Sequence, residues 1–171
     1  MMQNTQRIKV TILGSGTCVP SLKRNSCSAL VRGKSSHILL DAGPGTMGQL
    51  LKLGIQLDYT KVYHKPESLA YRLTDKAGFS VVYSGDTDFC EPLIDLSRKT
   101  DILICESAFP DGKKVSGHLT PSIAGEIAAK ARVRKLVLTH FYPVCDDFDI
   151  KAQCRNTFTG PLVLAEDLLN L

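Results

Sequence analysis

The hydrophobic and polar positions of this chain predict short strands that each end in a chemically active side chain. The clearest is the apolar run 79–84, which precedes a glycine and Asp86. Glycine lets the backbone turn sharply, so the carboxylate should point beyond the sheet edge. Similar runs end at Asp41, His64 and His140. If these strands share one direction, the four side chains meet at the carboxyl edge of a sheet, where open α/β folds bind ligands. Each Asp taken alone is equally well explained as an ordinary turn residue.

The rest of the pattern predicts a mixed α/β layered domain, with strand hairpins in the first half and helix–strand alternation in the second. Residues 81–83 are all apolar and predict a strand buried on both faces. Thr120 precedes a proline and is expected to cap a helix. Strands are expected at 8–13, 28–32, 36–40, 69–73, 79–84, 101–105, 135–139 and 162–165, and helices at 47–53, 91–98, 121–131 and 150–156.

Length and composition narrow the class of protein. The chain has 171 residues, of which 43% are hydrophobic, as expected for one globular domain spanning residues 1–171. It has neither a long apolar run nor an apolar N-terminal segment, which predicts a cytoplasmic protein that does not bind membranes. Its six cysteines form no Cys-x-x-Cys pair, so neither a zinc ribbon nor a disulfide framework is indicated, and Cys105 is expected to fill the core. A net charge of +4 permits an anionic substrate without arguing for nucleic acid by itself.

A glycine-rich turn follows the first predicted strand and raises the alternative of a dinucleotide site. The run Gly14-Ser-Gly16 matches the start of the dinucleotide fingerprint. However, the third glycine position holds Val19, and Pro20 follows where the fingerprint needs a helix. The partial match therefore argues against a nucleotide site at this turn.

The residues at the predicted strand ends point to metal chemistry. Imidazole and carboxylate groups are the ligands that zinc, iron and manganese bind in proteins, and a carboxylate can bridge two ions. Such ions activate water and polarise phosphoryl or carbonyl oxygens. Hydrolysis is therefore the reaction class that these side chains favour.

Five short motifs, taken in their order along the chain, resemble the metallo-β-lactamase superfamily and are nearest to its ribonuclease Z and phosphodiesterase-like branch. The resemblance covers nearly the whole chain. The motifs are Gly14-Ser-Gly-Thr-Cys-Val-Pro20, Leu39-Leu-Asp-Ala-Gly-Pro-Gly-Thr46, Tyr83-Ser-Gly-Asp-Thr87, Gly117-His-Leu-Thr120 and Leu138-Thr-His-Phe-Tyr-Pro143.

This resemblance implies a four-layer αββα sandwich with two divalent metal ions, zinc in the first place and iron or manganese as alternatives. Asp86 would bridge both ions and take part in catalysis, while His64 and His140 would each bind one. Asp41 would orient the metal ligands without binding a metal ion itself. His118 would be the second catalytic residue, assisting proton transfer near the leaving group. A polar residue beside a helix start is the other reading of His118.

The chain departs from the family at its main signature, the segment His-x-His-x-Asp-His, which is absent. Only four histidines occur, and His37 precedes Asp41, so it cannot substitute for that segment. The junction 61–63 looks like two family segments joined, through a deletion or a gap in the sequence. The short stretch between His64 and Asp86 also leaves no room for the long transfer-RNA-binding arm of some ribonuclease Z enzymes.

Two functions remain as hypotheses. The first is a metal-dependent hydrolase, a phosphodiesterase acting on a small phosphodiester or a nucleic-acid-derived substrate, with a homodimer as one expected assembly. The second is a catalytically inactive scaffold or binding domain that lacks half of the metal site. Taken literally, the 171-residue chain is expected to be inactive.

Overall fold

The computed structural model describes residues 9–15, 28–32, 37–40 and 45–171. The chain forms two compact units, Met1–Gln56 and Leu57–Leu171. The expectation of a single domain concerns how the two units assemble, and it stays a prediction. None of the helices in the described ranges is long and apolar enough to cross a membrane.

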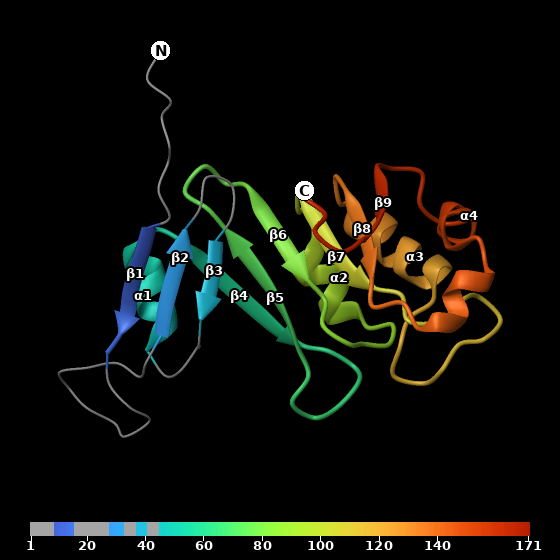
Figure 1. Ribbon diagram of the computed structural model, residues 1–171, viewed down its shortest axis with the longest axis horizontal. Coiled ribbons are helices and arrows are strands. Elements are labelled where there is room, and N and C mark those ends of the chain that lie inside the picture. Colours follow the sequence, from blue (N-terminus) through green and yellow to red (C-terminus); the bar gives the residue numbers. More distant parts are fainter. Residues whose placement is uncertain (1–8, 16–27, 33–36, 41–44) are drawn as a thin grey trace, which may run out of the picture. The chain divides into compact units, whose positions relative to one another are not determined.

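The first unit contains a three-stranded antiparallel sheet and one helix (Figure 1). The strands are β1 (Lys9–Gly14), β2 (Ser28–Arg32) and β3 (His37–Leu40), in that order across the sheet. Helix α1 (Thr46–Lys52) packs near β1, and Gly54 ends it with a positive φ of 71°. These elements agree with the strands and the helix predicted from the sequence, including the glycine stop.

The second unit is built on a six-stranded sheet in the order β4-β5-β6-β7-β8-β9. The arrows of β4 and β5 point in opposite directions in Figure 1. Strands β5 and β6 are antiparallel, whereas β6, β7, β8 and β9 are mutually parallel. The strands are β4 (Gln56–Lys61), β5 (Leu69–Thr74), β6 (Ser80–Tyr83), β7 (Ile102–Glu106), β8 (Leu136–Thr139) and β9 (Leu162–Leu164).

Helices cover one face of this sheet, and the hydrophobic core lies between the helices and the strands. Helix α3 (Pro121–Ala131) contacts β7 and β8 as well as α2 (Glu91–Ser97) and α4 (Ile150–Arg155), and a short 3₁₀ helix, Pro143–Asp147, precedes α4. Small residues on α3 allow its axis to approach the strands closely. The core side chains include Val82, Leu103, Leu136, Leu138, Ala124, Ile127 and Ala128, each of which is fully buried.

Two local expectations were wrong. Strand β6 is not buried on both faces: Val82 is fully buried, but the next residue, Tyr83, is 48% exposed, because successive side chains point to opposite faces and the helices cover only one. Thr120 does precede α3, yet its hydroxyl makes no capping hydrogen bond in the described part of the chain. The prediction for Cys105 is confirmed, since its side chain is fully buried and burial raises the pKa of its thiol.

Candidate functional site

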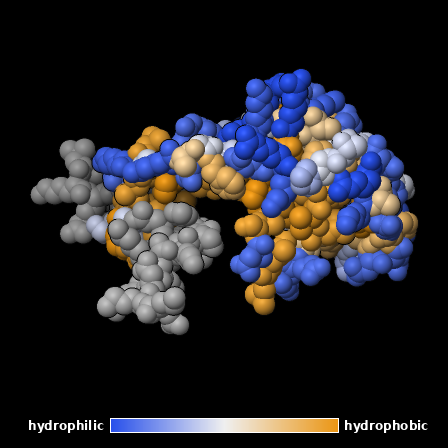
Figure 2. Space-filling model, turned by 90° about the horizontal axis from the view of Figure 1, so that it is seen from above, coloured by the Kyte–Doolittle hydropathy of each residue, from blue (hydrophilic) through white to orange (hydrophobic). Residues whose placement is uncertain are grey.

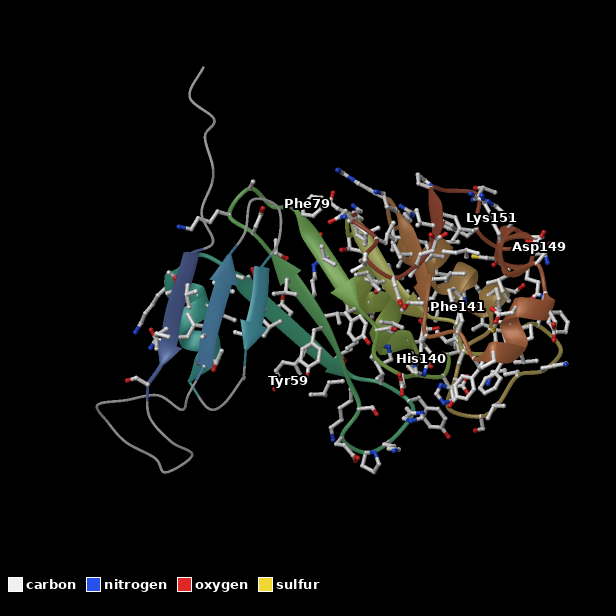
Figure 3. The ribbon with its side chains drawn as sticks, in the orientation of Figure 1. Tyr59, Phe79, His140, Phe141, Asp149 and Lys151 are labelled. Carbon is white, nitrogen blue, oxygen red and sulfur yellow. The ribbon has the colours of Figure 1, made fainter. Side chains whose placement is uncertain are left out.

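The parallel strands β6, β7 and β8 bring three polar residues to one edge of the sheet. Asp86 follows β6, Glu106 is the last residue of β7, and His140 comes directly after β8. Parallel strands end at the same edge, which explains why side chains far apart in the sequence become neighbours. Figure 3 shows His140 at this edge.

His140 and Asp86 lie next to each other, as predicted. The His140 Nε2 atom is 3.5 Å from Asp86 Oδ1, and about two fifths of each side chain is exposed, 39% and 41%. His140 adopts a left-handed backbone conformation with φ of 64°, which non-glycine residues rarely take. The imidazole is thus held at the edge by a backbone conformation that costs free energy.

His64 reaches the same region by a different route from the one predicted. Strand β4 ends at Lys61, so the expected strand running up to His64 is wrong. Tyr63 forms only an isolated bridge with Asp88, through an N–H···O bond of 2.7 Å. The chain bends at His64, and the Nδ1 atom of His64 lies 2.9 Å from the carbonyl oxygen of Gly117. Because a carbonyl only accepts, Nδ1 carries a proton, and the lone pair of a neutral His64 imidazole would lie on Nε2.

Glu106 holds the third imidazole, and the sequence analysis did not identify this residue. Its carboxylate is 2% exposed, and Oε1 lies 2.9 Å from His118 Nδ1. Three backbone N–H groups, those of Thr87, Ala108 and Leu119, also donate to the carboxylate at 2.8 to 3.1 Å. Since a carboxylate accepts, His118 carries a proton on Nδ1 and keeps Nε2 for other partners. The sequence signal that could have identified Glu106 is its position as a charged residue directly after the apolar run 101–105.

The ring of His118 contacts both of the other two imidazoles. The ring of His118 lies 4.8 Å from that of His64 and 5.7 Å from that of His140, measured between centroids. Phe109 and Tyr142 pack around it, with centroids 5.8 and 6.2 Å away. The structure therefore brings together the predicted residues His64, Asp86, His118 and His140.

The Asp88 carboxylate accepts hydrogen bonds from the loop that contains Gly117 and His118. Its Oδ2 atom accepts from Lys114 Nζ at 2.6 Å and from the Gly117 backbone N–H at 3.0 Å, and its Oδ1 atom accepts from the Phe89 backbone N–H. Partial burial would raise the pKa of Asp88, but these hydrogen bonds together outweigh it and hold the pKa below its ordinary value. Gly117 has φ of 87°, and a Cβ there would lie 3.0 Å from His64 Nδ1, so a larger residue would push against the ring.

The donors suit a divalent ion, but the described ranges hold only part of a metal site. With Nδ1 of His64 turned to the Gly117 carbonyl, Nε2 is the nitrogen that could bind a metal, and Asp86 and His140 are close enough to share an ion. A catalytic zinc needs three protein ligands. Among the described residues, no three or more His, Cys, Asp or Glu side chains are arranged so that they could hold a metal ion. Asp41 lies outside the described residues. The ligand set, the two ions and the role of Asp41 stay predictions.

Comparisons with known proteins agree with the fold. Among curated relatives, an uncharacterized protein of Mycobacterium tuberculosis is 36% identical over 128 residues, covering 74% of this chain and 45% of that protein. A ribonuclease Z of Salinispora arenicola is 32% identical over 154 residues, covering 86% of this chain and 47% of that enzyme. The chain thus spans about half the length of these curated relatives.

Solved structures show the same fold at low identity. The metallo-β-lactamase fold protein YhfI from Bacillus subtilis matches with a TM-score of 0.63 and 19% identity, over 93% of this chain and 96% of that one. The short form of human tRNase Z matches with a TM-score of 0.57 and 18% identity, over 94% and 97% of the two chains. The family model described as "Beta-lactamase superfamily domain" matches residues 50–141, more than half of the sequence. The chain therefore belongs to the metallo-β-lactamase superfamily, whose fold it has.

Proposed function

We propose that this protein is a metal-dependent phosphodiesterase and that this chain contains the residues that transfer a proton to the leaving group. The observation that carries the proposal is the pair Glu106–His118, a buried carboxylate 2.9 Å from an imidazole whose other nitrogen remains available. The family and its neighbours are hydrolases, which favours hydrolysis over other chemistry for this site. The substrate is a small phosphodiester or a nucleic-acid-derived phosphodiester.

His118 is the proton donor to the leaving group in this proposal. Glu106 fixes its tautomer, so that Nε2 is the nitrogen that exchanges a proton with substrate. The same hydrogen bond limits rotation of the ring, so Nε2 keeps one orientation. The backbone N–H groups that donate to Glu106 keep the carboxylate in place during the proton transfer.

Asp86, His64 and His140 are the residues of this chain that would hold a divalent metal ion. A bound divalent ion, zinc or else iron or manganese, would supply an activated water and polarise a phosphoryl oxygen. The Gly117 carbonyl orients His64 by accepting from Nδ1, as outer partners commonly do for ligand imidazoles. Asp41 is proposed to orient the ligands in the same manner.

A metal-poor scaffold or binding domain is the second candidate, because the chain lacks the segment His-x-His-x-Asp-His. The intact mass of the protein isolated from its natural source separates the two. A mass well above that of the 171 residues favours the enzyme, since it shows further sequence. A mass equal to that of the 171 residues favours the scaffold.

Metal content tests the ligand assignment. Asp86→Asn should remove more bound zinc, iron or manganese than His118→Ala, because Asp86 serves the ions and His118 serves the leaving group. Elemental analysis of both variants, each purified as the complete protein, measures the difference. Equal metal content in the two variants would remove Asp86 from the ligand set.

Activity on two esters tests the role of His118. His118→Ala should lower hydrolysis of an alkyl phosphodiester by about a hundredfold or more. The same variant should lose less activity on a nitrophenyl phosphodiester, whose leaving group needs little protonation. The exposed loop residue Ser116 provides the control, and Ser116→Ala should leave both rates unchanged. Equal losses on both esters would assign His118 a purely structural role.

A further inference from the structure

A basic pocket lies at the end of the six-stranded sheet opposite to His140. Figure 3 shows Phe79 at the start of β6 and His140 beyond the end of β8, at opposite ends of the sheet. The pocket has a volume of about 330 Å³, near the lower end of the range for small-molecule sites. It is lined by Arg72, Ala77, Gly78, Phe79, Ser80, Lys99, Asp101 and Arg134.

Arg72 is a fixed cation in this pocket. Its Nη1 atom donates to the carbonyl oxygens of Leu96 and Arg98 at 2.9 and 3.0 Å, and Nη2 donates to Ser80 Oγ at 3.2 Å. These three acceptors are uncharged. They hold the guanidinium in one position, so little side-chain entropy remains to be lost when an anion binds.

The other charged residues of the pocket leave an excess of positive charge. Lys99 and Arg134 are exposed cations, and Asp101 is the one carboxylate of the lining. Asp101 already accepts from Arg134 at 3.0 Å and from the Ser80 backbone N–H at 2.8 Å, and this backbone hydrogen bond lowers its pKa. Three cations against one carboxylate leave a net charge of +2 on the lining, which complements a phosphomonoester dianion.

A second pocket adjoins the first, and an aromatic ring stands at the edge of the first pocket. The second pocket has a volume of about 200 Å³ and is lined by Lys99 and Arg132, and by Arg98 and Lys130, which form ion pairs with Asp95 and Glu126. Figure 2 looks onto this end from above and shows hydrophilic residues around much of the outline of the second unit, with hydrophobic residues between them. Phe79 is 49% exposed and lines the first pocket, where it offers a face for stacking a flat ring.

We propose that this pocket binds a small phosphorylated ligand with a flat aromatic group, of the size of a nucleoside monophosphate. Arg72, Lys99 and Arg134 hold the phosphate, and Phe79 contacts the ring. This site does not depend on the phosphodiesterase activity proposed above, because it uses none of the residues at the opposite edge of the sheet.

The first test locates the binding of AMP by nuclear magnetic resonance on the complete protein. AMP should shift the backbone amide signals of Gly78 and Lys99 in a saturable manner, whereas adenosine, which lacks the phosphate, should require a far higher concentration. Shifts confined to Gly117, beside His118, would place the ligand at the other edge and overturn the proposal. Absence of saturation with AMP at millimolar concentration would also overturn it.

The second test uses variants at exposed positions that leave the core intact. Lys99→Gln and Arg134→Gln should each weaken AMP binding, measured by calorimetry, by about tenfold, the loss expected for one charge-assisted hydrogen bond. Lys151→Gln, an exposed lysine on α4, is the matched control and should bind AMP like the wild type. Phe79→Leu should weaken the binding of AMP but not of inorganic phosphate.

Equal affinity of all these variants for AMP would overturn the assignment. Tighter binding of a short oligonucleotide than of AMP, with the same dependence on Lys99, would also overturn it, because the ligand would then be a strand rather than a small molecule.

Discussion

The buried carboxylate of Glu106 allows a sharp test, because glutamine has nearly the same shape but only one acceptor oxygen. In the folded protein, Oε1 accepts from the Thr87 backbone N–H and lies 2.9 Å from His118 Nδ1. Oε2 accepts from the backbone N–H groups of Ala108 and Leu119, both at 3.1 Å. In Glu106→Gln, the NH2 group must therefore face two donors. These are either Thr87 N–H and His118 Nδ1–H, or the N–H groups of Ala108 and Leu119.

The cost of this substitution follows from the number of donors left without an acceptor. If the amide nitrogen replaces Oε2, two backbone N–H groups lose their acceptor. If it replaces Oε1, the Thr87 N–H loses its acceptor and His118 must change its tautomer to accept. Each buried donor without a partner costs about 1–3 kcal/mol. We expect the free energy of unfolding to fall by about 1–3 kcal/mol in the second case and about twice that in the first, out of a total of about 5–15 kcal/mol.

Urea unfolding followed by circular dichroism measures the loss. The slope of free energy against urea concentration should not change, since the surface exposed on unfolding is the same. Glu126→Gln is the matched control: this carboxylate is 44% exposed and pairs with Lys130 on the same helix, so the variant should unfold at the urea concentration of the wild type. An equal midpoint for Glu106→Gln would refute the reasoning that its carboxylate satisfies buried donors.

Further predictions concern the supporting structure. Gly117→Ala should lower the melting temperature more than Gly112→Ala, because both glycines have positive φ but only the first Cβ would press on His64. The lowered pKa of Asp88 contributes stability that is present above its ordinary value of 3.8 and is lost as the pH falls through the lowered value, so Asp88→Asn should flatten the acid limb of a stability profile. Leu103→Ala, at a fully buried position, should cost about 2–5 kcal/mol in urea unfolding.

The edge residues could be predicted because their signal is local. An apolar run followed by Asp86 or His140 places each side chain at a strand end, and the parallel direction of β6 and β8 then brings them together. The resemblance to a known family supplied His118. Elements such as α3 were predicted for the same reason, since small apolar residues recur at helical spacing within one stretch of sequence.

The features that the sequence analysis missed depend on contacts between distant residues. Glu106 becomes informative only once His118 and three backbone N–H groups surround it. The exposure of Tyr83 depends on which face of the sheet the helices cover, and an all-apolar run cannot show that. Likewise, Arg72 resembles any strand arginine until Leu96 and other acceptors from α2 and its C-terminal end fix its guanidinium.

The left-handed backbone of His140 means that a substitution which stabilises the protein would remove a side chain of the candidate site. Glycine would adopt its φ of 64° without the penalty of about 1 kcal/mol or more that a side chain carries there. A library screened only for heat resistance or expression yield should therefore enrich glycine at this position and discard the imidazole. Consensus design from thermally selected variants would erase the residue for the same reason, so a screen of this protein should include a readout that depends on the imidazole itself.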